Sequence, residues 1–394
     1  MPTPESVGGW LWRPLLGASL IQTVLFMVRP AMSYSILQFG GDATTIGWVT
    51  SLYAIAPMLL AIWIGRTAGR LSRIAVVPAV AVGVVAVACV VLALSVTIWM
   101  LAVASVLLGV GIVAVIVGGQ TWIARSAPPH RFDDAFGWMT AGMSLGQALG
   151  PVTMGLLVGG ADDIPDPSRL SATYWAAALL SVAALVCFLS RARRLYRASG
   201  PTSVESPRTL QILRIPRLVK YIFASAAVLT TIDILGAFLP AVGSAYGIPP
   251  TLVGALLAAR ALASMASRLF LGVMARRWDR VLLTSASTLI SAASMVVVAF
   301  WPEIISLFVA MIVGGVFLGV VQPLTISTVA TLVPERARSE ALALRLVGNR
   351  VAQAAAPLAA ALVAGAAGVA AVFALQAAFL ALSTVWVGFR RPSP

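Results

Sequence analysis

Residues 137–160 have the sequence GWMTAGMSLGQALGPVTMGLLVGG, with seven glycines, one proline and no charged residue. The stretch is long and apolar enough to cross a bilayer as a helix. Gly and Pro are the poorest helix formers, but glycines four residues apart let two membrane helices approach closely. Pro151 removes one backbone hydrogen bond and bends the helix. The sequence therefore predicts a bent, tightly packed membrane helix.

The composition of the whole chain is typical of an integral membrane protein. Of its 394 residues, 60% are hydrophobic and 10% are charged, and the mean hydropathy is +0.97. A soluble domain has about 25% charged residues. The apolar runs are continuous over about 20 residues, which favours helices over the alternating segments of a membrane barrel. No cleavable signal peptide is evident at the start of the chain.

The apolar runs divide the chain into two halves of six spans. The longest polar break, 191–217, is rich in Arg and contains three prolines. We therefore expect an all-α membrane protein with an N-terminal six-helix bundle (1–190), a cytoplasmic linker (191–217) and a C-terminal six-helix bundle (218–394). The predicted spans are 13–36, 46–65, 74–95, 98–123, 135–159, 170–190, 218–243, 251–274, 281–300, 304–330, 342–364 and 367–389.

Positive charge gathers in alternate breaks. The breaks on one side all contain Arg, whereas those on the other side together contain only Arg169. Arg-rich loops stay in the cytoplasm, which predicts an inner-membrane protein with both termini cytoplasmic. The net charge of +14 is thus explained by topology and by contact with membrane lipids, and we expect no nucleic-acid partner.

The two halves also repeat. A shift of 207 places Gly65 on Gly272 and Arg73 on Arg280, and a shift of 206 places Pro151 on Pro357. An even number of spans per half gives both repeats the same orientation, which is one of the known transporter plans.

Metal and enzyme sites are not indicated. The one histidine, His130, lies in a polar loop, and Cys89 and Cys187 lie in separate spans. A zinc site needs three or four clustered ligands. We therefore expect no metal, no cofactor, no disulfide and no catalytic residues.

At this point the chain resembles the major facilitator superfamily over its whole length. The break 65–73, GRTAGRLSR, is similar to the family's G-x-x-x-D-R-x-G-R/K signature, with Gly69 where the acid stands and Ser72 where Gly stands. Span four lacks the Arg of the R-x-x-Q-G motif found in many proton-coupled drug antiporters, because Ser105 occupies its place. The resemblance implies a twelve-helix transporter in which Gly65, Arg70 and Arg73 take part in conformational change.

Span five resembles the family's antiporter signature, G-x8-G-x3-G-P-x2-G-G. The matching residues are Gly137, Gly146, Gly150, Pro151 and Gly155, and Met154 replaces one glycine. The resemblance implies a gating helix and export by exchange. The alternative is that this Gly-rich face only packs helices.

Ionisable residues within the spans are costly, at roughly 2.5–3.5 kcal/mol each. Asp233 is the only acid in any predicted span. At about 1.5 Å per residue, Arg29, Asp233 and Arg260 lie ~24, ~22 and ~21 Å from the cytoplasmic ends of their spans. Tyr53 corresponds to Arg260 in the repeat. We therefore predict a polar layer of Arg29, Tyr53, Asp233 and Arg260 that binds substrate and protons, and Arg350 is a candidate guard of the inner mouth.

Two interpretations of this layer remain open. Asp233 either forms a fixed salt bridge that locks two helices, or carries a proton whose affinity changes as the halves rock. The excess of Arg favours anionic substrates, because Arg binds carboxylate and phosphate in a bidentate fork.

The sequence thus predicts a monomeric secondary transporter that exports a small amphipathic or anionic molecule in exchange for protons. The alternatives are multidrug efflux of neutral or cationic compounds, and a non-transporting receptor or scaffold.

Overall fold

The fold was described from a computed structural model, which covers residues 8–70, 76–126, 132–159, 165–189, 215–334 and 338–388. Within these ranges the chain is helical and contains no strand, which confirms the all-α prediction. The linker prediction for 191–214 and the placement of both termini lie outside the described residues. The helices of the N-terminal half are α1 (Gly8–Gln38), α2 (Ala43–Arg70), α3 (Val76–Ala93), α4 (Ile98–Ser126), α5 (Phe132–Val158) and α6 (Pro167–Leu189).

The C-terminal half contains five helical segments, of which the last covers two predicted spans. They are α8 (Pro216–Ala245), α9 (Pro250–Arg277), α10 (Arg280–Phe300), α11 (Ile304–Thr331) and α12 (Arg338–Gly388). Gly368 interrupts α12 with φ 79° and ψ 178°. This left-handed φ is one that glycine adopts without steric cost, so the chain turns close to the break that the sequence predicts between spans eleven and twelve.

Ten of the described helical segments are long and apolar enough to cross a membrane, with α12 taken as one. This finding confirms a multi-pass membrane protein. The short breaks carry polar caps: Asp42 accepts a hydrogen bond from the backbone N–H of Thr45 (2.8 Å) at the start of α2, and Asp166 accepts one from Ser168 (2.8 Å) at the start of α6. A capped helix can start directly after a short loop, because the cap satisfies an orphan N–H group.

By its internal contacts the chain divides into two compact units. Unit 1 comprises Met1–Gly41, Leu52–Gly200 and Pro249–Ala258, and unit 2 comprises Asp42–Ser51, Pro201–Ile248 and Ala259–Pro394. The first turns of α2 thus pack within unit 2, and the first turns of α9 pack within unit 1. The bundle boundaries expected from the sequence, 1–190 and 218–394, differ from these units by those two short segments and stay a prediction.

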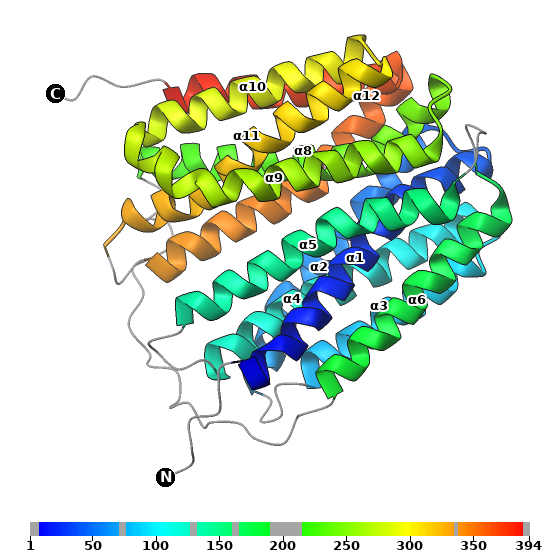
Figure 1. The fold of residues 1–394 in the computed structure, drawn as a ribbon, viewed down its shortest axis with the longest axis horizontal. Coiled ribbons are helices and arrows are strands. Elements are labelled where there is room, and N and C mark those ends of the chain that lie inside the picture. Colours follow the sequence, from blue (N-terminus) through cyan, green and yellow to red (C-terminus); the bar gives the residue numbers. More distant parts are fainter. Residues whose placement is uncertain are drawn as a thin grey trace. The chain divides into compact units, whose positions relative to one another are not determined.

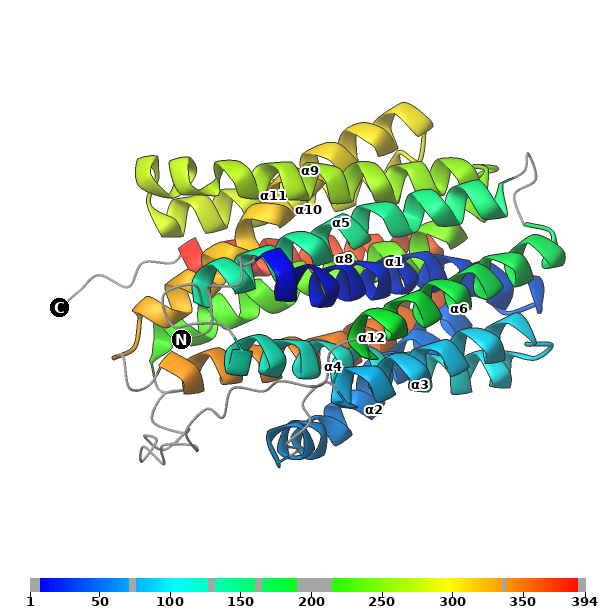
Figure 2. The ribbon, with the colours of Figure 1, turned by 60° about the horizontal axis from the view of Figure 1, so that its bottom comes forward.

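The two units are built by the same packing scheme. In unit 1, α1 packs along α5 and α6, and α3 packs against α4 and α6 (Figure 1). In unit 2, α8 packs along α12 and α11, and α10 packs against α11 and α12 (Figure 2). Each contact in one unit therefore has its counterpart in the other, as expected of a repeat.

The repeat extends to single hydrogen bonds. After α1, Gly40 has φ 77° and the N–H of Gly41 donates to the carbonyl of Ile36 (2.9 Å). After α8, Gly247 has φ 68° and the N–H of Ile248 donates to the carbonyl of Gly243 (2.8 Å). All three pairs of positions are 207 residues apart. Both helices thus end with the same left-handed glycine, a common helix terminus.

The glycines of α5 explain why a membrane helix contains so many poor helix formers. A Cβ added at Gly142 would lie 3.3 Å from the carbonyl oxygen of Leu15, and one added at Gly150 would lie 2.7 Å from that of Thr23. At Gly146 the added atom would overlap the carbonyl of Ser19. The spacing of four on both helices shows that α5 and α1 touch backbone to backbone, as small residues permit in membranes.

The cap at Asp42 yields a stability prediction. Asp42→Ala removes the acceptor for the Thr45 N–H and is expected to cost about 1 kcal/mol, whereas Asp42→Asn keeps an acceptor and costs less. The backbone N–H of Thr45 lowers the pKa of Asp42 below 3.8. The ionised cap therefore stabilises the fold fully above that value, and the benefit is lost as the pH falls through the lowered pKa. Thermal unfolding in detergent at pH 7 tests this, and equal melting temperatures for Asp42→Ala and the parent would contradict it.

Candidate functional site

Arg29 and Tyr53, both in unit 1, lie in direct contact. The guanidinium carbon of Arg29, on α1, lies 4.9 Å from the ring centroid of Tyr53, on α2. The two residues are 6% and 7% exposed. A cation over a desolvated aromatic face gains roughly 2 kcal/mol. This contact therefore helps to hold a buried positive charge in place.

Asp233 and Arg260 form the corresponding pair of charged residues in unit 2. Asp233, on α8, is 7% exposed, and Arg260, on α9, is 2% exposed. Their charges are close enough to act on each other electrostatically. The Nε atom of Arg260 is buried and has no hydrogen-bond partner among the described residues. Each unit thus contains two of the four residues of the predicted layer, and the single four-residue layer stays a prediction.

Tyr53 and Arg260 occupy equivalent backbone positions, as the repeat predicts. A Cβ added at Gly109 of α4 would overlap the carbonyl of Tyr53, and one added at Gly315 of α11 would overlap the carbonyl of Arg260. Gly109 and Gly315 are 206 residues apart. The backbone of Tyr53 therefore packs on Gly109 of α4 in the same way that the backbone of Arg260 packs on Gly315 of α11.

Asp233 is connected to Arg350 through Gln353. The Nε2 of Gln353 donates to Oδ2 of Asp233 (2.7 Å), and the Oε1 of Gln353 accepts from Nη1 of Arg350 (3.0 Å). A guanidinium can only donate and a carboxylate can only accept. The orientation of the amide between them is thus dictated by both partners. The carboxylate on α8 and the guanidinium on α12 are linked by one amide group.

Gln353 is the site residue that sequence reasoning missed. Its signals in the sequence are a polar side chain within an apolar run, three residues after Arg350, and its alignment with Gln147 in the repeat. None of these names a partner. Asp233 is 120 residues away along the chain, so only the packing of α8 against α12 reveals the contact.

A second polar cluster joins three helices of unit 2. Nη2 of Arg345, on α12, donates to Oε1 of Gln322 (2.7 Å), on α11. The Nε2 of Gln322 donates to the carbonyl of Ser225 (3.0 Å), on α8. Buried polar groups that are bonded to one another fix the relation of their helices. This cluster accounts for Arg345 as a structural residue of the core.

The first turns of α2 and α9 contain equivalent close contacts. In unit 2, a Cβ added at Gly47 would lie 2.7 Å from the carbonyl oxygen of Pro357. In unit 1, a Cβ added at Gly254 would lie 2.6 Å from the carbonyl oxygen of Pro151. Gly47 and Gly254 are 207 residues apart, and the prolines are 206 apart. Proline has no N–H to donate to the carbonyl four residues before it, so a helix bends at such a residue.

The predicted gate residues of α5 thus have two different neighbours. Gly146 and Gly150 pack on α1, whereas Gly155 packs on the first turns of α9, where an added Cβ would lie 3.1 Å from the carbonyl oxygen of Thr251. Gly65 and Arg70 lie near the end of α2, where only the backbone is described, and Arg73 lies outside the described residues. Their roles as gate residues stay a prediction.

No group of His, Cys, Asp and Glu that could hold a metal ion occurs among the described residues. Cys89 and Cys187 are both free thiols. The buried polar residues of the described helices include arginine, glutamine, asparagine, serine and threonine residues and the carboxyl of Asp233.

The sequence matches the family model described as Major Facilitator Superfamily twice, over residues 15–234 and 221–394. The chain belongs to the major facilitator superfamily. The two matches follow the internal repeat and together extend from α1 to the C-terminal end of the chain. Members of this family are multi-pass membrane transporters, and the match confirms the resemblance seen in the motifs of the chain.

Solved structures of transporters have the same fold. A POT family transporter in complex with 5-aminolevulinic acid is similar with a TM-score of 0.77 and 13% identity, covering 98% of this chain and 97% of that one. The nucleoside transporter NupG has a TM-score of 0.77 and 12% identity, covering 96% and 98%. A D-xylose-proton symporter has 0.76 and 13%, covering 96% and 97%. No curated protein sequence matches the chain.

The two glycine contacts with proline carbonyls yield a matched prediction. Gly47→Ala and Gly254→Ala each place a methyl group against a backbone carbonyl, so both variants are expected to lower the melting temperature in detergent. Gly83→Ala is the control, because a Cβ at Gly83 in α3 meets nothing within 4 Å. Since alanine favours helix over glycine, Gly83→Ala is expected to melt at or above the parent temperature. Equal melting of all three variants would contradict the described packing.

Proposed function

We propose that this superfamily member exports a small amphipathic or anionic organic molecule in exchange for protons. The protein lies in the inner (cytoplasmic) membrane as a monomer of two six-helix bundles that alternate in access. Both termini and the linker 191–217 are cytoplasmic in this proposal, in keeping with the Arg-rich breaks. The observation that carries the proposal is the chain of hydrogen bonds from Asp233 through Gln353 to Arg350.

The proton binds to Asp233 in this mechanism. Asp233 is the only acid in any predicted span and is buried on α8. An intramembrane carboxyl is costly unless it serves a purpose or is paired. The amide of Gln353 donates a hydrogen bond to its carboxyl group, and Arg260 is a second polar neighbour in unit 2. Any rearrangement that removes one of these partners favours proton uptake.

Gln353 transmits the protonation state of Asp233 to Arg350. While Asp233 is ionised, its carboxylate holds Nε2 and thereby turns Oε1 towards Arg350. A hydrogen bond to an ionised acceptor is roughly twice as strong as one between neutral groups. Protonation of Asp233 therefore weakens its hydrogen bond with Nε2 of Gln353. The new O–H of Asp233 can donate to Oε1 only if the amide of Gln353 turns over, and this turn moves Oε1 away from Arg350. Arg350 is then released.

The excess of positive charge sets the preference for anions. Arg29 and Arg260 are both buried, whereas Asp233 is the one acid in the predicted spans. Arginine recognises carboxylate and phosphate by two parallel hydrogen bonds. A simple lipophilic cation would be repelled by the same groups. This balance supports an organic anion or anionic amphiphile over the alternative of a cationic drug.

The glycine contacts of α5 and α9 support exchange between two conformations. Gly155 and Gly254 let the two helices touch without side chains between them. Such smooth surfaces separate and rejoin at small cost, since no interdigitated side chains need to withdraw. The equivalent contact at Gly47 and Pro357 belongs to unit 2.

The first functional prediction concerns proton coupling. In proteoliposomes with an imposed pH gradient, Asp233→Asn is expected to abolish uphill transport and to keep transport down a substrate gradient. Gln353→Leu removes the hydrogen bonds to Asp233 and to Arg350. It is expected to reduce uphill transport at least about tenfold, the factor that one hydrogen bond to a charged group gives.

The control for Gln353 is Gln376→Leu. Gln376 is also a buried glutamine on α12 that donates to α8, but its partners are Thr230, Thr231 and the carbonyl of Ala227. Gln376→Leu should reduce uphill transport less than about twofold once the amount of folded protein is equalised. If Gln376→Leu and Gln353→Leu reduce uphill transport equally, the amide of Gln353 has only a packing role.

The second functional prediction concerns substrate charge. Arg29→Ala and Arg260→Ala should each weaken transport of anionic compounds in a panel of anionic, neutral and cationic compounds, and should leave neutral ones largely unchanged. Unchanged apparent affinity for every anion in both variants would remove the charge argument. Transport of cations alone would favour multidrug efflux, and transport of none would favour a receptor or scaffold.

A further inference from the structure

One end of unit 2 gathers basic side chains from three helices. Figure 1 shows that α8 and α10 begin, and α9 and α11 end, at the same end of this unit. The turn between α9 and α10 lies between two candidate membrane spans, Pro250–Leu271 and Arg280–Phe300, and therefore at the membrane surface. Asp279 is the one acid among the described residues of these four helix ends, whereas the basic residues there are Arg217, Lys220, Arg276, Arg277 and Arg280.

Buried apolar clusters hold these helix ends in a fixed arrangement. One cluster joins α8, α10, α11 and α12 around Tyr221, and a second joins α9, α10 and α11 around Leu283. The charged groups of Arg217, Asp279 and Arg280 all lie close enough to the hydroxyl of Tyr221 to act on it electrostatically. The basic residues therefore form one cluster on a packed support.

Arg280 is oriented within this cluster by neutral groups. Its Nη1 donates to the hydroxyls of Thr328 (3.5 Å) and Thr331 (3.3 Å) at the end of α11. The neighbouring Asp279 accepts a hydrogen bond from the backbone N–H of Val281 (3.2 Å) as the N-cap of α10. A guanidinium has five N–H donors, so the two threonines fix its direction and leave donors for an anion.

An exposed apolar stripe runs along α10 from the basic cluster. It consists of Leu282, Leu289 and Val296, which are all exposed and lie seven residues apart, on one face of the helix. Exposed apolar side chains of a membrane span face lipid chains. Trp278, in the turn beside the arginines, is half exposed, and tryptophan is typical of the membrane–water interface. The arginines thus lie at the headgroup end of a lipid-facing surface.

We propose that this end of unit 2 binds an anionic phospholipid of the bilayer, with its phosphate at Arg276, Arg277 and Arg280 and one acyl chain along the stripe of α10. Arginine recognises phosphate through paired hydrogen bonds, and each basic residue near the surface adds attraction for an anionic headgroup. A zwitterionic lipid carries its own cation next to the phosphate, which the arginines repel. The site does not depend on the direction or the substrate of transport.

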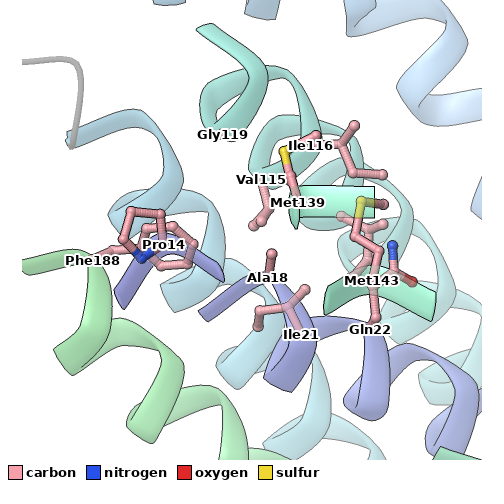
Figure 3. Close-up of a pocket in the computed structure, with 11 residues that line it drawn as sticks. Pro14, Ala18, Ile21, Gln22, Val115, Ile116, Gly119, Met139, Met143 and Phe188 are labelled. Carbon is pink, nitrogen blue, oxygen red and sulfur yellow. The ribbon is translucent and has the colours of Figure 1, made fainter. Parts of the chain in front are cut away.

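The pocket of unit 1 does not offer an enclosed alternative for the lipid chain. It lies among α1, α4, α5 and α6, and Figure 3 shows apolar side chains, with Gln22 beside them, converging on it. Its free volume is about 20 Å³, which is room for about one water molecule. An acyl chain does not fit there, so the lipid is expected on the surface of unit 2.

The experiment is native mass spectrometry of the purified full-length protein in a nonionic detergent, with equimolar dioleoyl-phosphatidylglycerol and dioleoyl-phosphatidylcholine. The parent should retain the phosphatidylglycerol at least about fivefold more than the phosphatidylcholine, the factor that one basic residue near an anionic headgroup gives. Arg277→Gln and Arg280→Gln should each lower phosphatidylglycerol binding about fivefold. Arg169→Gln is the matched control, because Arg169 is exposed on α6 and lies in a break on the other side of the predicted membrane. It should lower binding less than about twofold.

The double variant Thr328→Val with Thr331→Val separates a built site from general attraction between charges. Valine keeps the shape of threonine and removes the hydroxyls that orient Arg280, while the net charge stays the same. Binding of phosphatidylglycerol should fall at least about twofold, the lower end of the cost of immobilising one long side chain. The melting temperature of each variant shows whether it is folded.

Three results would overturn the proposal. The first is equal retention of the two lipids by the parent. The second is a loss of binding in Arg169→Gln as large as that in Arg277→Gln, or no loss in the threonine double variant, because either would reduce the effect to net charge. The third is displacement of the lipid by a tenfold excess of soluble glycerol 3-phosphate, which would show a site for free phosphate.

Discussion

A carboxyl group buried in the membrane is the constraint on which the C-terminal half depends. Placing an acid in a span costs roughly 2.5–3.5 kcal/mol, and the neighbours of Asp233 offset this cost by an amide donor and a nearby guanidinium. The same amide also holds Arg350. Any change in the charge of the carboxyl therefore alters two helices, α8 and α12, through one side chain. A fixed salt bridge between two residues would not reach a third in this way.

The repeat gives the two units the same helix packing, but their buried polar residues differ. The carbonyls of Tyr53 and Arg260 pack against equivalent glycines. The two units therefore place these side chains at matched positions. In unit 1 the side chain is an aromatic ring under Arg29, and in unit 2 it is a cation near Asp233. Of the three charged residues among these four, Asp233 is the one acid, and Arg stays protonated. Both halves thus share the same backbone packing, and the carboxyl group of this set of residues lies in unit 2.

Much of this architecture can be predicted from the sequence, because a membrane helix is a local feature. Apolar runs of the right length predict the spans, and the turn at Gly368 lies two residues from the predicted break at 365–366. The equivalence of Tyr53 and Arg260 follows from the repeat. The bond between Gln353 and Asp233 and the pocket beside Gln22 cannot be predicted in the same way. They depend on which faces of distant helices meet, and hydropathy does not fix the rotation of a helix about its axis. Their clearest trace in the sequence is a polar residue within an apolar run.

The most direct test of the account is infrared difference spectroscopy of the protein between acidic and neutral pH, with isotope-labelled glutamine side chains. The account predicts a carboxylic acid carbonyl band that disappears in Asp233→Asn. It also predicts a change in the glutamine amide band that rises together with the acid band, is lost in Gln353→Leu and is kept in Gln376→Leu. An acid band from Asp233 with no accompanying change in the amide of Gln353 would contradict the account, because the proton would then act without the link to Arg350.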